Sequence, residues 1–161
     1  DFKHIFHKGS GDMYVGTGDS SYRNFPLLQS PGVWLYPNEN KLNIRFNTYN
    51  NDVMYKSADV GNIPLNKWFM LTIVLIGNSV DIYINNMLKK RENVGVVRMN
   101  YGDLQINPFG GFDGYVSQLQ YFDHAIAASD IESIVATGPA QGACIDTKEK
   151  PPYLDDSWWL N

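Results

Sequence analysis

Residues 110–139 constrain the fold more than any other part of this chain, because they read as a tight turn, a strand and a helix in immediate succession. The turn contains Gly110, Gly111 and Gly114, and glycine adopts positive φ without steric cost. Residues 115–122 alternate between a face rich in tyrosine and leucine and a face rich in glutamine, which predicts a strand with the first face buried. No catalytic motif lies within this stretch, so it indicates a fold more clearly than a function.

The second half of the stretch predicts a helix over residues 130–137. Ser129 and Glu132 have the spacing of a capping box, in which the serine oxygen accepts a backbone N–H and the glutamate reaches back. Apolar residues recur at helical spacing, Gly138 can end the helix in the left-handed conformation, and Pro139 prevents its continuation. Because so short a helix is not stable alone in water, it is expected to dock on the sheet.

The rest of the chain reads as short strands separated by turn-forming residues. The strongest strand signal is the apolar run at residues 68–76, which is followed by Gly77-Asn78 and an alternating segment, the pattern of a β-hairpin. The other predicted strands cover residues 3–8, 33–36, 42–49, 53–57, 80–85, 88–92 and 103–107. Short strands without βαβ alternation or repeats predict an all-β fold, an antiparallel β-sandwich with one short helix.

The composition limits the partners that this chain can take. Its 161 residues suggest one domain, and 43% hydrophobic residues are enough for a core. A net charge of −4 should repel a phosphate backbone, so no nucleic-acid partner is expected. The single Cys144 excludes an internal disulfide. The chain opens directly on core-like sequence, and we expect further strands or a membrane anchor ahead of Asp1.

Two regions are expected, a β-sandwich at residues 1–140 and a tail at residues 141–161. The tail is aromatic and acidic, and two adjacent tryptophans near a chain end rarely stay in water. We therefore expect Tyr153, Trp158 and Trp159 to pack on the sandwich or to dock on a partner.

Three ordered motifs resemble laminin-G-like domains. They are Trp68 with the hairpin VDIYINN at residues 80–86, the segment FDGYVS at residues 112–117, and the helix at residues 127–134. The resemblance covers roughly residues 30–140 and implies a concanavalin A-like jelly roll, the fold of many lectins and glucanases.

Four longer sequence segments make the resemblance more specific. The phrases HIFHKG, SPGVWLYPNENKL, GDLQINPFGGFDGYVSQLQYF and PPYLDDSWW resemble laminin-G-like domains encoded by large double-stranded DNA viruses of algae and amoebae. This resemblance implies a virion protein, often with an N-terminal membrane segment. The chain departs from the family in having Asn86 at the hairpin glycine and in lacking strands upstream of HIFHKG. A jelly roll without such a strand exposes a sheet edge or uses a partner's strand.

The sequence gives no reason to expect an enzyme. Glucanases with this fold use paired glutamates in an E-x-D-x-x-E arrangement, whereas Glu39, Glu92, Glu132 and Glu149 are scattered over turns, a strand end, a helix cap and the tail. The nearby pair of histidines, at positions 4 and 7, has no carboxylate partner in the sequence and is read as core or surface residues.

A carbohydrate site needs aromatic faces for stacking and oxygen-bearing side chains for hydroxyls, sometimes with Ca²⁺ held by oxygen ligands. The residues that can supply these groups are Tyr36, Asn47, Tyr49, Tyr55 and Asp113. Asp113 is the single metal-ligand candidate, and its other interpretation is the cap of an Asx-type turn. No cofactor other than Ca²⁺ is expected.

Two non-enzymatic functions remain open from the sequence. The first is a structural or interaction module of a virion, which buries its aromatic tail and an open sheet edge against capsid neighbours. The second is a lectin-like module that binds glycans, with or without calcium. The first is slightly favoured, because docking features are clearer than any ligand site. Membrane attachment is expected only through an anchor ahead of Asp1.

Overall fold

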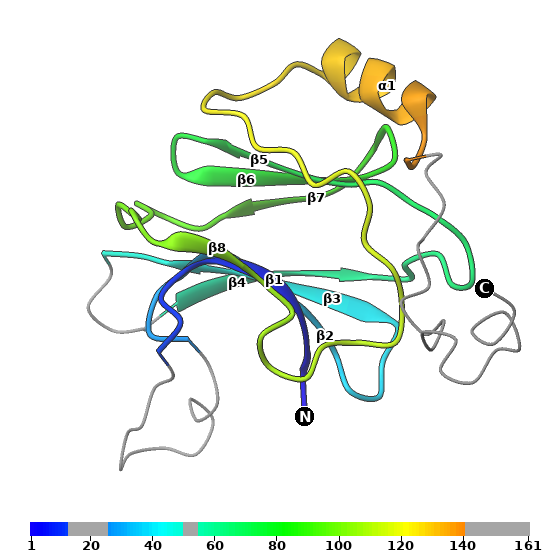
Figure 1. The fold of residues 1–161 in the computed structure, drawn as a ribbon. Coiled ribbons are helices and arrows are strands. Elements are labelled where there is room, and N and C mark those ends of the chain that lie inside the picture. The colour runs from blue at the N-terminus through cyan, green and yellow to red at the C-terminus, as the bar shows by residue number, and fades with distance from the viewer. Residues whose placement is uncertain (13–25, 50–54, 141–161) are drawn as a thin grey trace, which may run out of the picture.

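The computed structural model describes residues 1–12, 26–49 and 55–140 of the chain. They form two antiparallel sheets and one helix, which confirms the predicted all-β sandwich (Figure 1). The large sheet has the strand order β4-β3-β2-β1-β8 and consists of β1 (Lys3–Gly9), β2 (Gln29–Leu35), β3 (Lys41–Asn47), β4 (Tyr55–Gly61) and β8 (Asp103–Ile106). The small sheet has the order β5-β6-β7 and consists of β5 (Leu71–Ile76), β6 (Ser79–Ile84) and β7 (Met87–Asn93). The helix α1 spans Ala128–Thr137.

The core lies between the two sheets and follows the alternation of the strands. On β3, Leu42, Ile44 and Phe46 are buried and point to the small sheet, and on β6 the matching residues include Val80 and Ile82. Side chains two residues apart share a face of a strand, so each strand contributes every second residue to this layer. Full burial of one such side chain contributes about 1.5–3 kcal/mol to folding.

The predicted hairpin in the small sheet is confirmed, but its first strand begins later than predicted and its second turn has a different geometry. β5 begins at Leu71 rather than at Trp68, which is half exposed. Gly77 has a φ of 59° in the first turn, a positive value that glycine adopts without steric cost. In the second turn the positive φ, 58°, falls on Asn85 and not on Asn86. The turn therefore forms without the family's glycine, because asparagine tolerates the left-handed region.

The predicted strand at residues 115–122 is wrong. None of these residues belongs to a strand, and Tyr115 and Tyr121, which were expected to be buried, are 77% and 78% exposed. Gln118 has a φ of 50°, which interrupts an extended backbone. A strand forms only where a second strand pairs with it, and no described strand pairs with this segment.

Helix α1 is confirmed, but its predicted capping box is wrong. The helix begins after Ala127, and the Asp130 carboxylate accepts the Ala127 N–H at 3.0 Å. Asp130, two residues before Glu132, therefore supplies the carboxylate that reaches back to the start of the helix, the role predicted for Glu132. The predicted stop is confirmed, since Gly138 has a φ of 67°. Ile131 is the buried residue of the helix. Within the described ranges, no helix is both long and apolar enough to cross a membrane.

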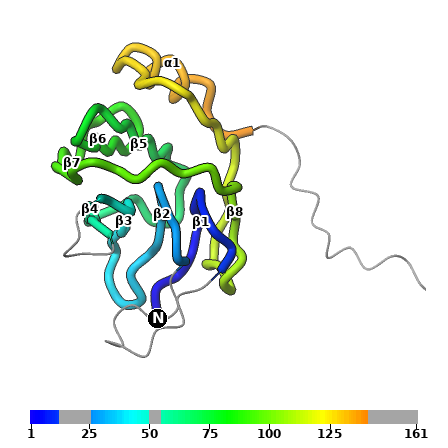
Figure 2. Tube along the Cα trace, turned by 90° about the vertical axis from the view of Figure 1, so that its left-hand side faces the viewer, coloured from blue at the N-terminus to red at the C-terminus, as the bar shows by residue number. Residues whose placement is uncertain are grey.

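The two sheets do not cover each other completely. In Figure 2 the small sheet lies over the β4 and β3 side of the large sheet, and β7 contacts β4. Its opposite edge, β5, faces the side where β1 and β8 lie. On that side the segment after β8 rises toward α1 (yellow in Figures 1 and 2). The large sheet therefore extends beyond the small one at β1 and β8.

Candidate functional site

A cluster of polar and aromatic side chains covers the outer face of the large sheet. On β3, Asn43 and Arg45 alternate with the core residues and so point away from the small sheet. Their neighbours on β4 share this outer face, because Asn43 lies opposite Asp59 in the ladder. We call this the polar-aromatic cluster, and it consists of Phe2, Tyr36, Lys41, Asn43, Arg45, Tyr55 and Asp59.

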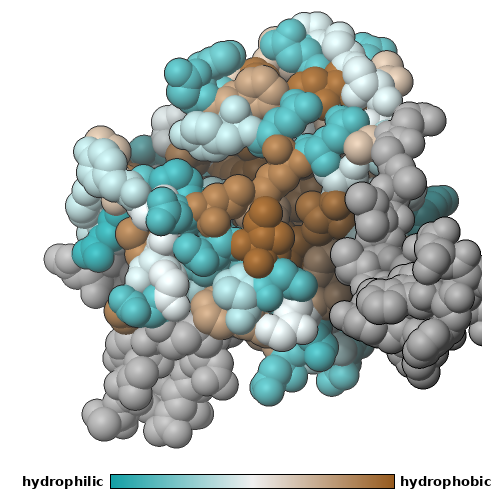
Figure 3. Space-filling model, in the orientation of Figure 1, coloured by the Kyte–Doolittle hydropathy of each residue, from teal (hydrophilic) through white to brown (hydrophobic). Residues whose placement is uncertain are grey.

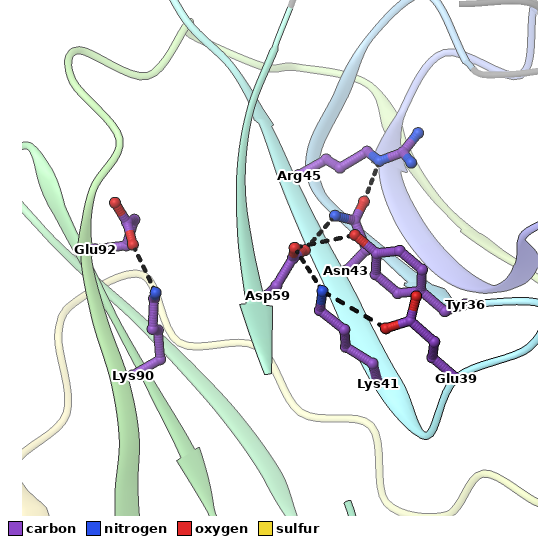
Figure 4. Close-up of polar contacts among 8 residues, drawn as sticks. All are labelled: Tyr36, Glu39, Lys41, Asn43, Arg45, Asp59, Lys90 and Glu92. Atoms are coloured by element: carbon purple, nitrogen blue, oxygen red, sulfur yellow. Dashed lines mark hydrogen bonds and ion pairs between the residues drawn. The ribbon is translucent and has the colours of Figure 1, made fainter. Parts of the chain in front are cut away.

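Asp59 is the acceptor at the centre of the polar-aromatic cluster (Figure 4). Its carboxylate accepts hydrogen bonds from Asn43 Nδ2 at 2.6 Å and Tyr36 OH at 3.0 Å, and Lys41 Nζ lies at 3.3 Å. Burial raises the pKa of Asp59, but these donors outweigh it and hold the pKa below its usual value. Lys41 also lies over the Tyr36 ring, 4.5 Å from its centroid. The carboxylate is thus ionised and well satisfied at neutral pH.

Arg45 is the buried cation of the polar-aromatic cluster, with 2% of its surface exposed. Its guanidinium lies 4.7 Å from the ring centroids of both Phe2 and Tyr55, a cation–π arrangement. Its Nε donates to Asn43 Oδ1. Burial lowers the pKa of Arg45 to about 10, so it still carries its charge at neutral pH. The polar groups therefore bind one another, while Tyr36, Lys41 and Asp59 form a partly exposed rim.

Two buried histidines extend this face toward β8. His4 Nε2 and His7 Nδ1 are 3.0 Å apart, and His7 Nε2 lies 2.9 Å from the Ser10 carbonyl oxygen. A carbonyl oxygen only accepts, so His7 carries its proton on Nε2 and accepts from His4 on Nδ1. His4 Nδ1 is left buried without a hydrogen-bond partner.

A β-bulge puts both histidines on the same face. Residues three apart point to opposite faces of a regular strand, but the pairing of β1 with β2 shifts by one residue between His4 and Phe6. His4 consequently packs against Trp34, with 4.5 Å between ring centroids, and Phe109 contacts both histidines. Burial, together with the neighbouring His7, lowers the pKa of His4 to about 4, and burial also lowers that of His7. Both rings are neutral at pH 7.

The structure brings together two of the five predicted ligand residues. Tyr36 and Tyr55 both belong to the polar-aromatic cluster. Asn47 is 3% exposed, and its Oδ1 accepts the Gln29 N–H at 2.6 Å. Tyr49 lies beyond the end of β3 under Arg98, and Asp113 is exposed in the loop after β8. No three His, Cys, Asp or Glu side chains within the described residues are grouped as metal ligands. Tyr153, Trp158 and Trp159 lie outside the described residues.

A second surface, which the sequence did not single out, lies where the small sheet fails to cover the large one. Ile106 lies opposite Phe6, a residue that packs on the core, so Ile106 points to the core side of the sheet. Leu104, two residues away, shares that side. Yet Leu104 is 49% and Ile106 53% exposed. Core-facing residues are exposed here because none of the described strands lies over β8.

The neighbouring elements also carry exposed apolar side chains. Leu75 of β5 is exposed on the core side, and Val116, Leu119 and Phe122 follow β8 in the chain. Figure 3 shows apolar surface gathered between the two sheets, over β8 and the segment after it. We call this surface the open flank and define it by the β5 edge, Leu104, Ile106 and residues 115–122. The alternating pattern of residues 115–122 was the one sign of the open flank in the sequence. From this pattern we predicted that its tyrosine and leucine residues are buried, whereas they are exposed.

The chain was compared with known proteins. No family model matches it, and no curated protein matches it. Among solved structures it is similar to an S-layer domain-containing protein (residues 221–444) from Clostridium thermocellum, with 15% sequence identity and a TM-score of 0.39 over 78% of this chain and 71% of that chain.

Proposed function

We propose that this protein is a non-catalytic interaction module that buries its open flank against a neighbouring protein. The observation that carries the proposal is the exposure of Leu104 and Ile106 on the core-facing side of β8. Contiguous apolar surface of this kind marks sites of association in soluble proteins. Because the sequence resembles laminin-G-like domains of large DNA viruses, we propose that this neighbour is a virion or capsid component.

Co-purification with virus particles tests this proposal. Ile106→Glu places a charge in the open flank, and Met87→Glu, at a 60% exposed position on β7, is the matched control. The proposal predicts that Ile106→Glu is lost from purified particles while Met87→Glu and the unchanged chain are retained. Circular dichroism should show that both variants are folded. Equal retention of the two variants would refute association through the open flank.

A second candidate function, carbohydrate binding, is favoured by one observation. Tyr36 and Tyr55 converge on one face together with the rim groups of Lys41 and Asp59. Aromatic faces beside charged and hydroxyl groups are the ingredients of a sugar site. Most polar atoms of the polar-aromatic cluster bind each other, so few of them are available to a ligand. For this reason carbohydrate binding is the second candidate and association through the open flank is the first.

A glycan array with the isolated chain tests the second candidate. Binding that Tyr55→Ala abolishes and Tyr101→Ala leaves unchanged would assign the polar-aromatic cluster as a lectin site; Tyr101 is 87% exposed and lies outside it. Loss of binding with EDTA would add calcium to the mechanism. Absence of binding to every glycan would refute the lectin function.

A further inference from the structure

Within the described residues, no second strand pairs with the β5 edge of the small sheet. The other three sheet edges carry charges or are short: β4 contains Lys56 and Asp59, β7 contains a basic run, and β8 has four residues beginning with Asp103. β5 reads LTIVLI, without a charge or a proline. Charges and prolines are the usual devices that keep a sheet edge from pairing. Of the four edges, β5 alone lacks them.

The unpaired backbone groups of this edge can be assigned. The two-residue turn sets Ile76 opposite Ser79, and Met70 O accepts the Asn85 N–H at 2.7 Å. Hydrogen-bonded pairs alternate along an antiparallel ladder, so the even-numbered residues of β5 bond to β6. The N–H and C=O groups of Leu71, Ile73 and Leu75 therefore point to the free edge. Within the described residues, no strand pairs with them.

A second unpaired segment lies on the same side. Residues 115–122 have the alternation of a strand and rise beside β1 and β8, the side that β5 faces (Figure 2). Between the two, the core-facing side of β8 is exposed at Leu104 and Ile106. One additional strand would pair with β5, offer an edge to residues 115–122 and cover β8.

We propose that the open flank takes up an extended peptide strand of about six residues, apolar at alternate positions, from a neighbouring protein chain. This inference rests on the proposed function and names the form of the partner. The occupant has to pair on both sides, so it needs two free edges. The β5 edge of a second copy has one side already paired with its own β6, which favours a single strand over a folded copy.

A peptide display library tests the inference. Peptides of about ten residues with apolar side chains at alternate positions are selected on the whole chain, and a library of equal composition without alternation is the control. We expect enrichment from the alternating library only. Selected peptides should slow amide exchange at Leu71, Ile73 and Leu75 and within residues 115–122. Absence of enrichment over the control library would overturn the inference, and so would protection confined to other amides.

Two variants locate the binding. Leu75→Lys places a charge at the β5 edge and should weaken binding of a selected peptide about tenfold or more, whereas Met87→Lys on the opposite edge should change it by less than about twofold. Concentration-dependent dimerisation of the chain that protects the same amides would assign the edge to a second copy and overturn the inference. If Ile106→Glu is lost from particles while no peptide protects β5, the proposed function stands and strand uptake is refuted.

Discussion

Leu75 and Val80 lie directly opposite each other in the β5–β6 ladder, on the core side of the small sheet, but Val80 is fully buried and Leu75 is 39% exposed. Residues opposite each other share a face, so the difference reflects their distance from the sheet edge. One strand inward, at Val80, the sandwich is closed, and at Leu75 it is open, whereas Leu71 and Ile73 earlier in β5 pack against the core. Leu104 and Ile106 show the same transition on the large sheet.

Alanine substitutions should reveal this difference as stability. Ile82→Ala removes a fully buried side chain and should lower the free energy of unfolding by about 2–5 kcal/mol. Ile106→Ala, on the same inner side of the other sheet, should lower it by less than about 1 kcal/mol, because Ile106 is half exposed. Urea denaturation measures both. Equal losses would show that the flank is closed in solution.

Amide exchange along β5 should alternate. Thr72, Val74 and Ile76 bond to β6 and should exchange slowly, while Leu71, Ile73 and Leu75 face the free edge and should exchange faster. Residue-resolved exchange by NMR on the chain alone measures this. Uniform protection along β5 would mean that the edge is already paired.

Stability should fall as the pH drops through the histidine range. The pKa of His4 is about 4 in the folded chain and about 6.5 when unfolded, so the unfolded state takes up the proton first. The contribution of His4 is complete above pH 6.5 and declines toward pH 4, at up to about 1.4 kcal/mol per pH unit. His7, whose pKa is also lowered, acts in the same direction.

Denaturation between pH 7.5 and 4.5 measures this slope. His7→Gln should make it shallower, since one buried neutral ring is removed. His124→Gln is the comparison variant, because it removes a histidine at an exposed position. A slope unaffected by His7→Gln would contradict the assignment of neutral, buried rings.

The start of α1 can be tested against the capping box expected from the sequence. Asp130→Ala removes the acceptor of the Ala127 N–H and should speed amide exchange in the first turn, whereas Ser129→Ala should not. Exchange rates from Ala127 to Ile131 measure this. The reverse order would support the Ser129 and Glu132 box.

The strands were predictable where pattern and pairing agree. Residues 41–47 alternate and have neighbours on both sides, so the prediction there matches the structure closely. Residues 115–122 alternate equally well but have no neighbouring strand. Local sequence carries the side-chain pattern, while pairing depends on distant segments, and for this reason the exposure of the flank could not be predicted.

The polar-aromatic cluster shows the same limit. Tyr36 and Tyr55 were selected by residue type. The ladder of β3 with β4 places Tyr55 on the outer face, and Tyr36, which follows β2, reaches the same face through its hydrogen bond to Asp59. Arg45 and the histidines were not selected, because their common face depends on strand register and on a bulge in β1. An odd spacing in the sequence hides such a pair, since regular alternation places its members on opposite faces.

Photo-crosslinking in purified particles tests association through the open flank. Benzoylphenylalanine is placed at position 106 in one variant and at position 87 in another, both more than half exposed in the chain alone. Each variant is irradiated in particles and analysed by mass spectrometry. We expect a discrete adduct with one protein partner at position 106 and none at position 87. No adduct at position 106, or the same diffuse labelling at both positions, would contradict it.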